Sequence, residues 1–430
     1  MDQRQQINEY MDILAEGNYF NGCVLASHKG KVILNEGYGL SSYQYAIENT
    51  PITKFRIGSL TKSFTAAAIL LLHQQEKLNL FDMIHTYIKD FPAEKGVTIH
   101  HLLSHSSGVA DFTFSPEYWE KFMRLPSSLE KSINWIKSNP LQFQPGKDMQ
   151  YSNAGYLLLT ALIENVSGLP YEQFLLENIF KPLQLKNTGI DNGRKIVTDL
   201  ASGHSVWEEA IHPEYVDMSI PQGAYGMYST AEDLFKWTEA LRNGLLLNKC
   251  MTLKMFTANP EGYGYGWFIN GEQGTARHSG DINGFTNELL MNFKEDLTIV
   301  ILSNMNITPA DKICEDLSRI TLKEKVRMPQ RLAYSNDPIP WRMLTGEYRA
   351  HELYAAVHWG ENKLFVTMPK KYGALYKYEI KPITIADDKV FFKSDFINED
   401  FIFDLKGQCL EFVDVYEQKQ TLKKQTALIS

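Results

Sequence analysis

The alternation of apolar and polar positions predicts helices in the middle of the chain and strands at both ends of its first part. Apolar residues at helical spacing indicate an amphipathic helix over 3–16, and the apolar run 64–72 indicates a helix buried nearly all round. A further apolar helix over 153–166 stops at a Ser-Gly-Leu-Pro sequence. Strand patterns occupy 22–34, as a hairpin, and return between 263 and 303. A sheet made from distant parts of the chain, with a helical insertion, leaves a cleft between two lobes.

The pattern changes near residue 340 and predicts an all-β tail. Helix and loop character dominates 59–245, whereas short alternating apolar stretches separated by turns follow residue 340, as is typical of a small antiparallel barrel. Pro, Asn and Ser cluster in 328–340 and indicate a linker. We therefore expect an α/β (α+β) fold over 1–327, in which an antiparallel sheet is flanked by helices and a helical lobe. An all-β barrel-like domain over 341–430 follows the linker.

Composition fits a soluble globular protein and excludes several classes of partner. The chain has 430 residues, of which 44% are hydrophobic and 22% charged, so two or more domains with ample core are expected. A net charge of −8 gives no electrostatic basis for binding nucleic acid or an anionic membrane. Neither a membrane-spanning run nor an apolar leader core is present, which predicts a cytoplasmic protein, or an extracytoplasmic one if a leader was removed. The cysteines lie far apart and are expected to be free thiols: Cys23, Cys250, Cys314 and Cys409.

A serine with an amine one helical turn away is the strongest chemical signal in the chain. Ser59 and Lys62 have the spacing that places two side chains on one helix face. A serine hydroxyl needs a base within hydrogen-bond reach to act as a nucleophile, and S-x-x-K supplies one. A second copy, Ser128 to Lys131, lies in a polar stretch without partner motifs. The alternative for Ser59 is a helix N-cap with Lys62 in solvent.

Two further motifs have residues suited to acyl transfer. In Tyr151-Ser152-Asn153, a tyrosine near cationic groups can act as a base, while the asparagine amide can fix a substrate carbonyl or hold Lys62. In His278-Ser279-Gly280-Asp281, the missing Cβ of Gly280 lets a substrate backbone approach the strand edge. The N–H of Asp281 can pair with the N–H of Ser59 as an oxyanion hole. Taken singly, Tyr151 fits a core tyrosine, Asn153 a helix cap and His278 a structural histidine.

In order and spacing, the three motifs resemble the serine β-lactamase and penicillin-binding-protein superfamily. The resemblance is closest to its branch of class C β-lactamases, D,D-peptidases and esterases, and it extends over roughly 5–325. The segments 101–108, 226–234 and 265–267 are similar too, and the β-rich tail resembles the lipocalin-like domain of some members.

The resemblance implies a role for each motif residue. Ser59 would be acylated, Lys62 and Tyr151 would move protons, and Asn153 would orient the substrate. His278 stands where the family has the Lys of K-T-G, and a neutral imidazole holds a substrate carboxylate less firmly than an ammonium does. We therefore expect esters and amides to be better substrates than β-lactams. Acylation by β-lactams should rise as the pH falls and His278 gains charge.

The sequence thus predicts a serine hydrolase that forms an acyl-enzyme at Ser59, of peptidase or esterase type. A β-lactamase is the alternative within the enzyme class, and a non-catalytic binding protein that keeps the fold is the alternative outside it. The expected partners are a small-molecule or peptide substrate, with β-lactams as acylating ligands, and no cofactor. No metal site is expected, since His101 and His105 have i, i+4 spacing but lack the Glu of H-E-x-x-H. The natural substrate and the oligomeric state are left open.

Overall fold

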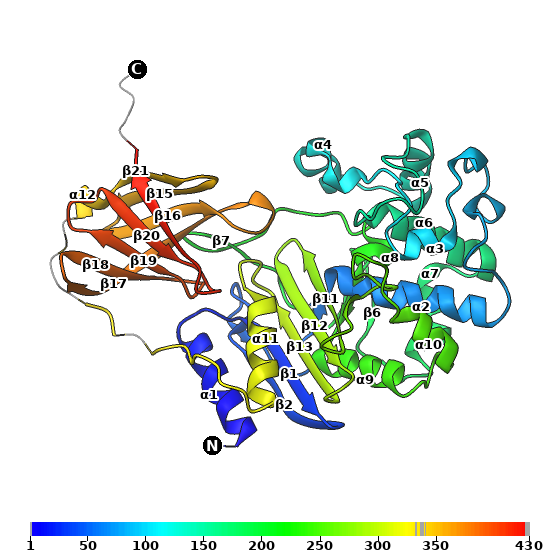
Figure 1. Ribbon diagram of the computed structural model, residues 1–430, viewed down its shortest axis with the longest axis horizontal. Coiled ribbons are helices and arrows are strands. Elements are labelled where there is room, and N and C mark those ends of the chain that lie inside the picture. The colour runs from blue at the N-terminus through cyan, green and yellow to red at the C-terminus, as the bar shows by residue number, and fades with distance from the viewer. Residues whose placement is uncertain (1, 332, 336–338, 340, 426–430) are drawn as a thin grey trace.

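The computed structural model describes residues 2–331, 333–335, 339 and 341–425. Figure 1 shows three regions side by side: a β-barrel, a central sheet and a helical lobe. Among the described residues, no helix has both the length and the apolar character that crossing a bilayer requires.

Most helices lie in the lobe and on the two faces of the central sheet, and α12 lies on the barrel. The α-helices are α1 (Gln3–Glu16), α2 (Thr61–Gln74), α3 (Ile99–Leu103), α4 (Pro116–Glu120), α5 (Leu129–Ser138), α6 (Asn153–Ser167), α7 (Tyr171–Leu175), α8 (Gln222–Tyr225), α9 (Ala231–Arg242), α10 (Lys249–Met255), α11 (Ala310–Thr321) and α12 (Trp341–Leu344). The shorter helical turns are η1 (Gly58–Leu60), η2 (Ile84–Thr86), η3 (Ala93–Lys95), η4 (Phe112–Phe114), η5 (Phe122–Arg124), η6 (Leu176–Phe180) and η7 (Lys371–Gly373).

The strands form a central sheet, a barrel and two small sheets. The central sheet contains β1 (Gly22–His28), β2 (Lys31–Tyr38), β10 (Phe268–Asn270), β11 (Thr275–Ile282), β12 (Phe285–Asn292) and β13 (Leu297–Ser303). The barrel contains β14 (Gly346–Ala350), β15 (Leu353–Gly360), β16 (Lys363–Pro369), β17 (Leu375–Ala386), β18 (Lys389–Ser394), β19 (Asp400–Asp404), β20 (Cys409–Val413) and β21 (Lys419–Lys424). The remaining strands are β3 (Leu40–Ser42), β4 (Ile47–Glu48), β5 (Phe55–Arg56), β6 (Gly189–Ile190), β7 (Ser205–Trp207), β8 (Glu209–Ile211) and β9 (Met227–Ser229).

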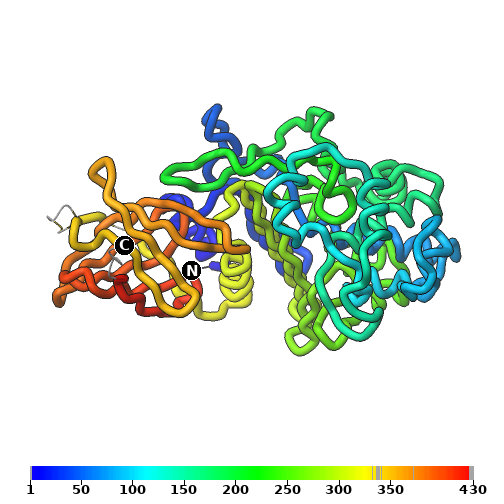
Figure 2. Tube along the Cα trace, turned by 90° about the horizontal axis from the view of Figure 1, so that it is seen from above, coloured from blue at the N-terminus to red at the C-terminus, as the bar shows by residue number. Residues whose placement is uncertain are grey.

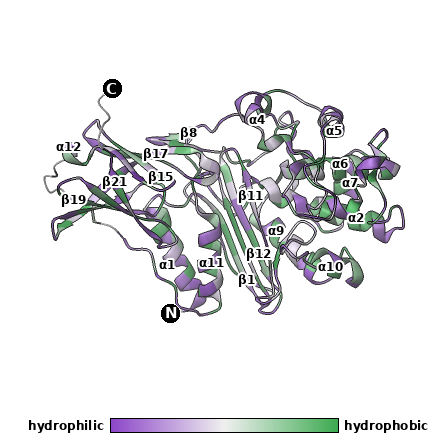
Figure 3. Ribbon diagram, turned by 45° about the horizontal axis from the view of Figure 1, so that its top comes forward, coloured by the Kyte–Doolittle hydropathy of each residue, from purple (hydrophilic) through white to green (hydrophobic). Residues whose placement is uncertain are grey.

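The central sheet joins the two ends of the first part of the chain, as expected. Its order is β10-β11-β12-β13-β1-β2, and all neighbouring strands are antiparallel. The predicted hairpin is β1 and β2, and β1 also pairs with β13, with Leu25 opposite Val300. One face packs against α1 and α11, and the other packs against α9 and contributes to the apolar core that contains α2 and α6. Because both faces are covered, β12 and β13 are buried throughout, and the central strands carry both green and purple segments in Figure 3.

Helix α2 forms the buried axis of the lobe, as the apolar run predicted. All residues from Thr61 to Leu72 are buried. The helix begins at Thr61, and Ser59 precedes it in the single turn η1. Its N-cap is Leu60, so Ser59 is not the helix cap that the alternative assigned to it. The helix is therefore fixed by burial along its length, and it presents η1 at its N-terminal end.

The C-terminal strands form the expected barrel, and the closed eight-stranded barrel fits the lipocalin-like resemblance. The strands β14–β21 run in one antiparallel circuit, which the β14–β21 and β16–β17 pairings close. The predicted linker at 328–340 lies partly outside the described residues, and its described residues form neither helix nor strand. The domain division at 327 and 341 stays a prediction.

Helix and loop character dominates 59–245, as expected, but the segment also contains short strands that the sequence analysis did not predict. Among these strands, β7 and β8 extend the barrel sheet. Strand β7 pairs with β17 in parallel, Trp207 opposite Lys377. Figure 2 shows this green segment reaching along the barrel, and β7 lies between β17 and β8 in the sheet. A strand of three residues is too short to show an alternating pattern. The barrel partner of β7, β17, also lies far away in the sequence.

The barrel core includes residues from the first part of the chain. Val206, Met305 and Ile307 are buried in the same apolar cluster as Leu344 and Tyr348 of the barrel. A hydrogen bond also crosses the junction, because the Tyr416 hydroxyl donates to Asp311 Oδ2 on α11 at 2.6 Å. The barrel is therefore packed against the central sheet region through a shared core.

We expect Met305→Ala to destabilise the protein by about 2–5 kcal/mol, because it removes a side chain from this shared core and leaves a cavity. Met305 is 3% exposed, while Met83 is 41% exposed, so Met83→Ala is the matched control. Urea unfolding measures both. Equal, near-zero effects of the two substitutions would show that the junction does not contribute to stability.

Candidate active site

The structure brings Ser59 and Lys62 into direct contact. Lys62 Nζ lies 2.9 Å from Ser59 Oγ. Ser59 is partly exposed, whereas the Lys62 side chain is fully buried beneath it. The alternative of a solvated Lys62 is therefore wrong, and the serine hydroxyl has an amine within hydrogen-bond reach.

Lys62 Nζ has three polar neighbours, which can accept the three N–H groups of an ammonium or, in the neutral form, leave one position for the lone pair. Besides Ser59, Nζ donates to Asn153 Oδ1 at 2.7 Å and to the Ala224 carbonyl oxygen at 2.9 Å. Both of these oxygens are acceptors only, so they use two N–H groups. A neutral amine then has one lone pair left, and the remaining neighbour is the Ser59 hydroxyl. The geometry leaves the lone pair available for the serine proton.

Burial favours the same protonation state. It lowers the pKa of Lys62 well below the ordinary value for a lysine, and the more distant Asp111 carboxylate offsets only part of this effect. The amine is surrounded by aromatic rings, including Tyr151, whose centroid lies 4.7 Å from Nζ. Burial therefore favours the neutral form of the amine that lies beside the serine.

Tyr151 also lies beside Lys62, but its pKa is raised, whereas the sequence analysis expected it to be lowered. Burial raises the pKa of Tyr151 well above the ordinary value for a tyrosine. The contact with Ser59 lowers this pKa, but its effect is smaller than that of burial. The Tyr151 hydroxyl oxygen is buried and has no hydrogen-bond partner of normal geometry within the described part of the chain. Tyr151 is thus a neutral phenol here, and the expectation that neighbouring cations lower its pKa is not supported.

Asn153 contacts Lys62, which is one of the two roles considered for it. Its amide Nδ2 donates to Thr113 Oγ1 at 3.0 Å, which fixes Oδ1 toward Lys62. Thr113 donates in turn to Asp111 Oδ1 at 2.7 Å. The other carboxylate oxygen of Asp111 accepts the backbone N–H groups of Asn153 and Ala154 at the start of α6. The sequence analysis missed Asp111 and Thr113, because no local motif links them to residue 153.

His105 was also missed as a site residue, although it lies in one of the segments that carried the resemblance. It is fully buried, and its ring centroid lies 4.4 Å from that of Tyr151. Its Nδ1 accepts the Ser152 backbone N–H at 3.1 Å. Burial lowers the pKa of His105 well below its ordinary value, and the nearby Lys62 and His278 lower it further. His105 is therefore a neutral ring that supports Tyr151 from below.

His278 lies at the site, but it does not have the pH response expected of it. Its ring packs 5.9 Å from the Tyr151 ring, and Nε2 lies 3.2 Å from the Tyr263 hydroxyl. Burial, together with Lys62 and Arg277, lowers its pKa to about 3, against a smaller effect of the Ser279 carbonyl. The imidazole is thus neutral above that pH. The expected rise of β-lactam acylation, as falling pH adds a charge to His278, is therefore not supported near neutral pH.

The structure requires glycine at position 280 for a reason other than the expected approach of a substrate backbone. A Cβ on Gly280 would lie 2.0 Å from the Ile57 carbonyl oxygen, so the glycine lets β11 pack on the turn before Ser59. Gly58 has φ 53°, and a Cβ there would lie 2.7 Å from the Asp281 nitrogen. Two glycines thus bring the Ser59 turn against the strand at Asp281. This close approach is compatible with an oxyanion hole formed by the two backbone N–H groups.

The other candidates of the sequence analysis have structural roles. Ser128 caps α5, because its hydroxyl accepts the Lys131 backbone N–H at 3.2 Å. His101 Nδ1 accepts the Thr98 backbone N–H in the capping box of α3, whereas His105 lies under Tyr151. The second S-x-x-K and the i, i+4 histidine pair are therefore products of helix capping and turn geometry.

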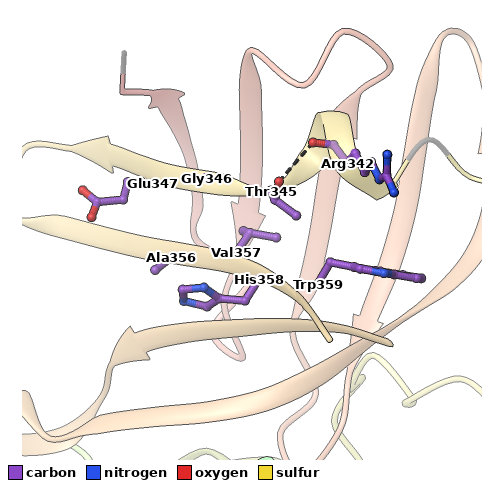
Figure 4. A pocket seen from close by; sticks show the side chains of 8 residues that line it. All are labelled: Arg342, Thr345, Gly346, Glu347, Ala356, Val357, His358 and Trp359. Atoms are coloured by element: carbon purple, nitrogen blue, oxygen red, sulfur yellow. Dashed lines mark hydrogen bonds between the residues drawn. The ribbon is translucent and has the colours of Figure 1, made fainter. Parts of the chain in front are cut away.

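A shallow pocket on the barrel is separate from this site. Figure 4 shows its lining residues on α12, β14 and β15, with the Thr345 hydroxyl donating to the Arg342 carbonyl at 3.0 Å. Its lining residues are Arg342, Thr345, Gly346, Glu347, Ala356, Val357, His358 and Trp359. None of them belongs to the motifs around Ser59.

The fold and the motif arrangement define a member of the β-lactamase/transpeptidase-like superfamily, whose members are serine hydrolases. Residues 5–322 match the Beta-lactamase family. The match covers well over half of the chain, and the chain belongs to this family.

Relatives and solved structures agree with this assignment. Protein flp of Staphylococcus aureus (strain MW2) is 31% identical over 344 residues, 75% of this chain and 68% of that protein. The putative penicillin-binding protein PbpX of Bacillus subtilis (strain 168) is 30% identical over 305 residues, 70% of this chain and 74% of that protein. The octameric penicillin-binding protein homologue from Pyrococcus abyssi has a TM-score of 0.67 at 23% identity, over 97% of this chain and 99% of its own. This last likeness shows that the shared fold extends over the barrel.

The buried amine leads to a pH-dependent stability. Unfolding returns the pKa of Lys62 to about 10.4, so the unfolded chain takes up a proton between the lowered pKa and that value. Stability must therefore rise with pH in this range, by up to about 1.4 kcal/mol per pH unit. Urea unfolding at pH 7 and pH 9 should show wild type gaining stability relative to Lys62→Met.

The exposed lysine in Lys31→Met controls for the loss of one positive charge. If wild type and Lys62→Met change equally between the two pH values, Lys62 is protonated in the folded protein and the assignment of a neutral amine is wrong.

Proposed function

We propose that this protein is a serine hydrolase that forms an acyl-enzyme at Ser59 and hydrolyses amide or ester bonds, as a penicillin-binding-protein-like peptidase or an esterase. The observation that supports it most directly is the buried Lys62 amine, 2.9 Å from Ser59 Oγ. Two of its contacts are to acceptor-only oxygens, which leaves its lone pair for the serine proton.

In the proposed acylation step, neutral Lys62 takes the Ser59 hydroxyl proton as Oγ attacks the substrate carbonyl. The N–H groups of Ser59 and Asp281 hold the developing oxyanion. The close approach of Gly58 to the Asp281 nitrogen supports this pairing. Asn153 keeps the amine in place, because Asp111 and Thr113 fix its side-chain oxygen toward Nζ.

Tyr151 has the protonation state of a proton donor. Its neutral phenol is proposed to give its proton to the leaving amine or alcohol when the tetrahedral intermediate collapses. The resulting phenolate is stabilised by Lys62, which carries the proton taken from Ser59, and the proton passes back between them. Hydrolysis of the acyl-enzyme then runs in reverse, with water in place of the leaving group and the same two residues moving the proton.

Simple esters and amides are the proposed substrates, and β-lactams are proposed to be slow acylating ligands. The neutral, buried His278 offers no positive charge to a β-lactam carboxylate. A β-lactamase needs both that grip and rapid release of a stable acyl-enzyme. Steady-state kinetics with nitrocefin and p-nitrophenyl butyrate rank the two substrate classes, and a nitrocefin kcat/KM near about 10⁷–10⁸ M⁻¹s⁻¹ would make this protein a β-lactamase.

Acylation at Ser59 is testable by mass. A fluorophosphonate should add one label to wild type and none to Ser59→Ala. Ser128→Ala should retain the label, because Ser128 caps α5 and lies outside the site, and it should lose about 1 kcal/mol of stability. Intact-mass spectrometry measures the label on each protein, and urea unfolding measures the stability of Ser128→Ala. A label that persists on Ser59→Ala refutes the assignment, and an unlabelled wild type favours a non-catalytic protein.

Lys62→Ala and Tyr151→Phe should each lower kcat by about 10²–10⁴, because each removes a proton-transfer group. The double variant should lose much less than the product of the two, since the groups act as one unit. Tyr171→Phe is the control, because that buried hydroxyl lies 2.6 Å from Thr65 Oγ1, outside the motifs. Turnover of p-nitrophenyl butyrate measures all four variants. Near-wild-type kcat in Tyr151→Phe would remove it from the proton path.

A further inference from the structure

A turn of the barrel has an unusual backbone conformation. The turn joins β16 to β17 and is closed by hydrogen bonds from Lys370 N to Ala374 O at 2.9 Å and from Gly373 N to Lys370 O at 3.0 Å. Tyr372 lies at its tip with φ 58° and ψ 19°. The left-handed region disfavours a bulky residue, and such residues occur where the surroundings impose the conformation. Tyr372 therefore calls for a reason beyond the turn itself.

The stem of the turn is fixed in the barrel. Lys370 Nζ lies 2.7 and 2.6 Å from the two carboxylate oxygens of Glu399, which is 3% exposed. Tyr378 donates to the same carboxylate at 2.9 Å. This buried, fully paired charge holds the first residue of the turn in one position, so the tip cannot move freely relative to the barrel.

The tip reaches the strand that borders Ser59. The Tyr372 hydroxyl donates to Asp281 Oδ2 on β11 at 2.8 Å. Asp281 in turn packs against the nucleophile turn at Gly58. In Figure 1 the orange end of the barrel hairpin points toward this side of the central sheet.

The ring of Tyr372 is presented to solvent at this point. The residue is 83% exposed, and Leu375, at the other end of the same turn, is 53% exposed. Strand β10 pairs with β11 only from Thr275 to Arg277, so β10 does not cover the strand at Asp281. An apolar, rigidly held surface thus lies beside the part of β11 along which a substrate would extend.

We propose that Tyr372 is a specificity-determining residue, which the barrel supplies to the mouth of the Ser59 site and which contacts an apolar or aromatic group of the substrate. The inference rests on the proposed serine hydrolase function. It gives the barrel a direct part in substrate choice and none in the proton transfers. The hydrogen bond to Asp281 sets the ring position, and the aromatic face provides the contact.

The test compares substrates that carry a small or an aromatic group on either side of the scissile bond. Suitable pairs are p-nitrophenyl acetate against p-nitrophenyl phenylacetate, and ethyl acetate against benzyl acetate. We expect Tyr372→Ala to lower kcat/KM for the aromatic member of at least one pair by about three- to tenfold, with less than a twofold change for the small member. Tyr372→Phe keeps the ring but loses the bond to Asp281, and it should show a smaller loss of the same selectivity.

Tyr416→Ala is the matched control. That tyrosine also lies on the barrel, is 45% exposed and donates to a carboxylate of the first part of the chain, but this carboxylate is Asp311 on α11 and not Asp281. It should leave both ratios unchanged. Unchanged ratios in Tyr372→Ala, or faster turnover of the aromatic substrates, would overturn the proposal while fluorophosphonate labelling of Ser59 persists. If wild type is not labelled, the proposed function itself fails.

Discussion

The burial of the Lys62 amine beside a partly exposed serine is the constraint on which the site depends. Water stabilises an ammonium far better than a protein interior does, so a lysine held without water tends to give up its proton. The same amine in solvent would be charged at neutral pH and useless as a base. The interior must therefore replace the lost hydration with a small number of acceptors, and the Asn153 side chain and the Ala224 carbonyl do so.

Much of the surrounding fold keeps that arrangement in place. Helix α2 is buried from Thr61 to Leu72, so Lys62 has no route to solvent along its own helix. Asn153 begins α6, and the Asp111 carboxylate that caps this helix also orients the asparagine through Thr113. The same buried environment holds Tyr151, His105 and His278 neutral. The burial that these side chains share thus sets the protonation state of the whole group.

The barrel is joined to this apparatus by contacts of two kinds. A shared apolar core that includes Val206, Met305 and Ile307 fixes the barrel against the central sheet region. The polar contact from Tyr372 to Asp281 then reaches the strand beside the nucleophile. Apolar packing is not directional, whereas a hydrogen bond at the end of a stiff turn places one side chain closely. The shared core therefore determines the position of the barrel, and the hydrogen bond places Tyr372 beside the strand at the site.

The sequence by itself determined the elements whose signals are local. Helical spacing gave α1, the apolar runs gave α2 and α6, and alternation gave the barrel strands, because each burial pattern repeats within the segment that forms it. The S-x-x-K spacing gave Ser59 and Lys62 as a pair for the same reason. Only the tertiary structure decided what depends on distant partners: the strands β7 and β8, the support of Asn153 by Asp111, and the contact of Tyr372 with Asp281. It also decided the protonation states of Lys62, Tyr151 and His278, since a pKa depends on how completely the fold removes water from a group, and no spacing of residues along a chain specifies that.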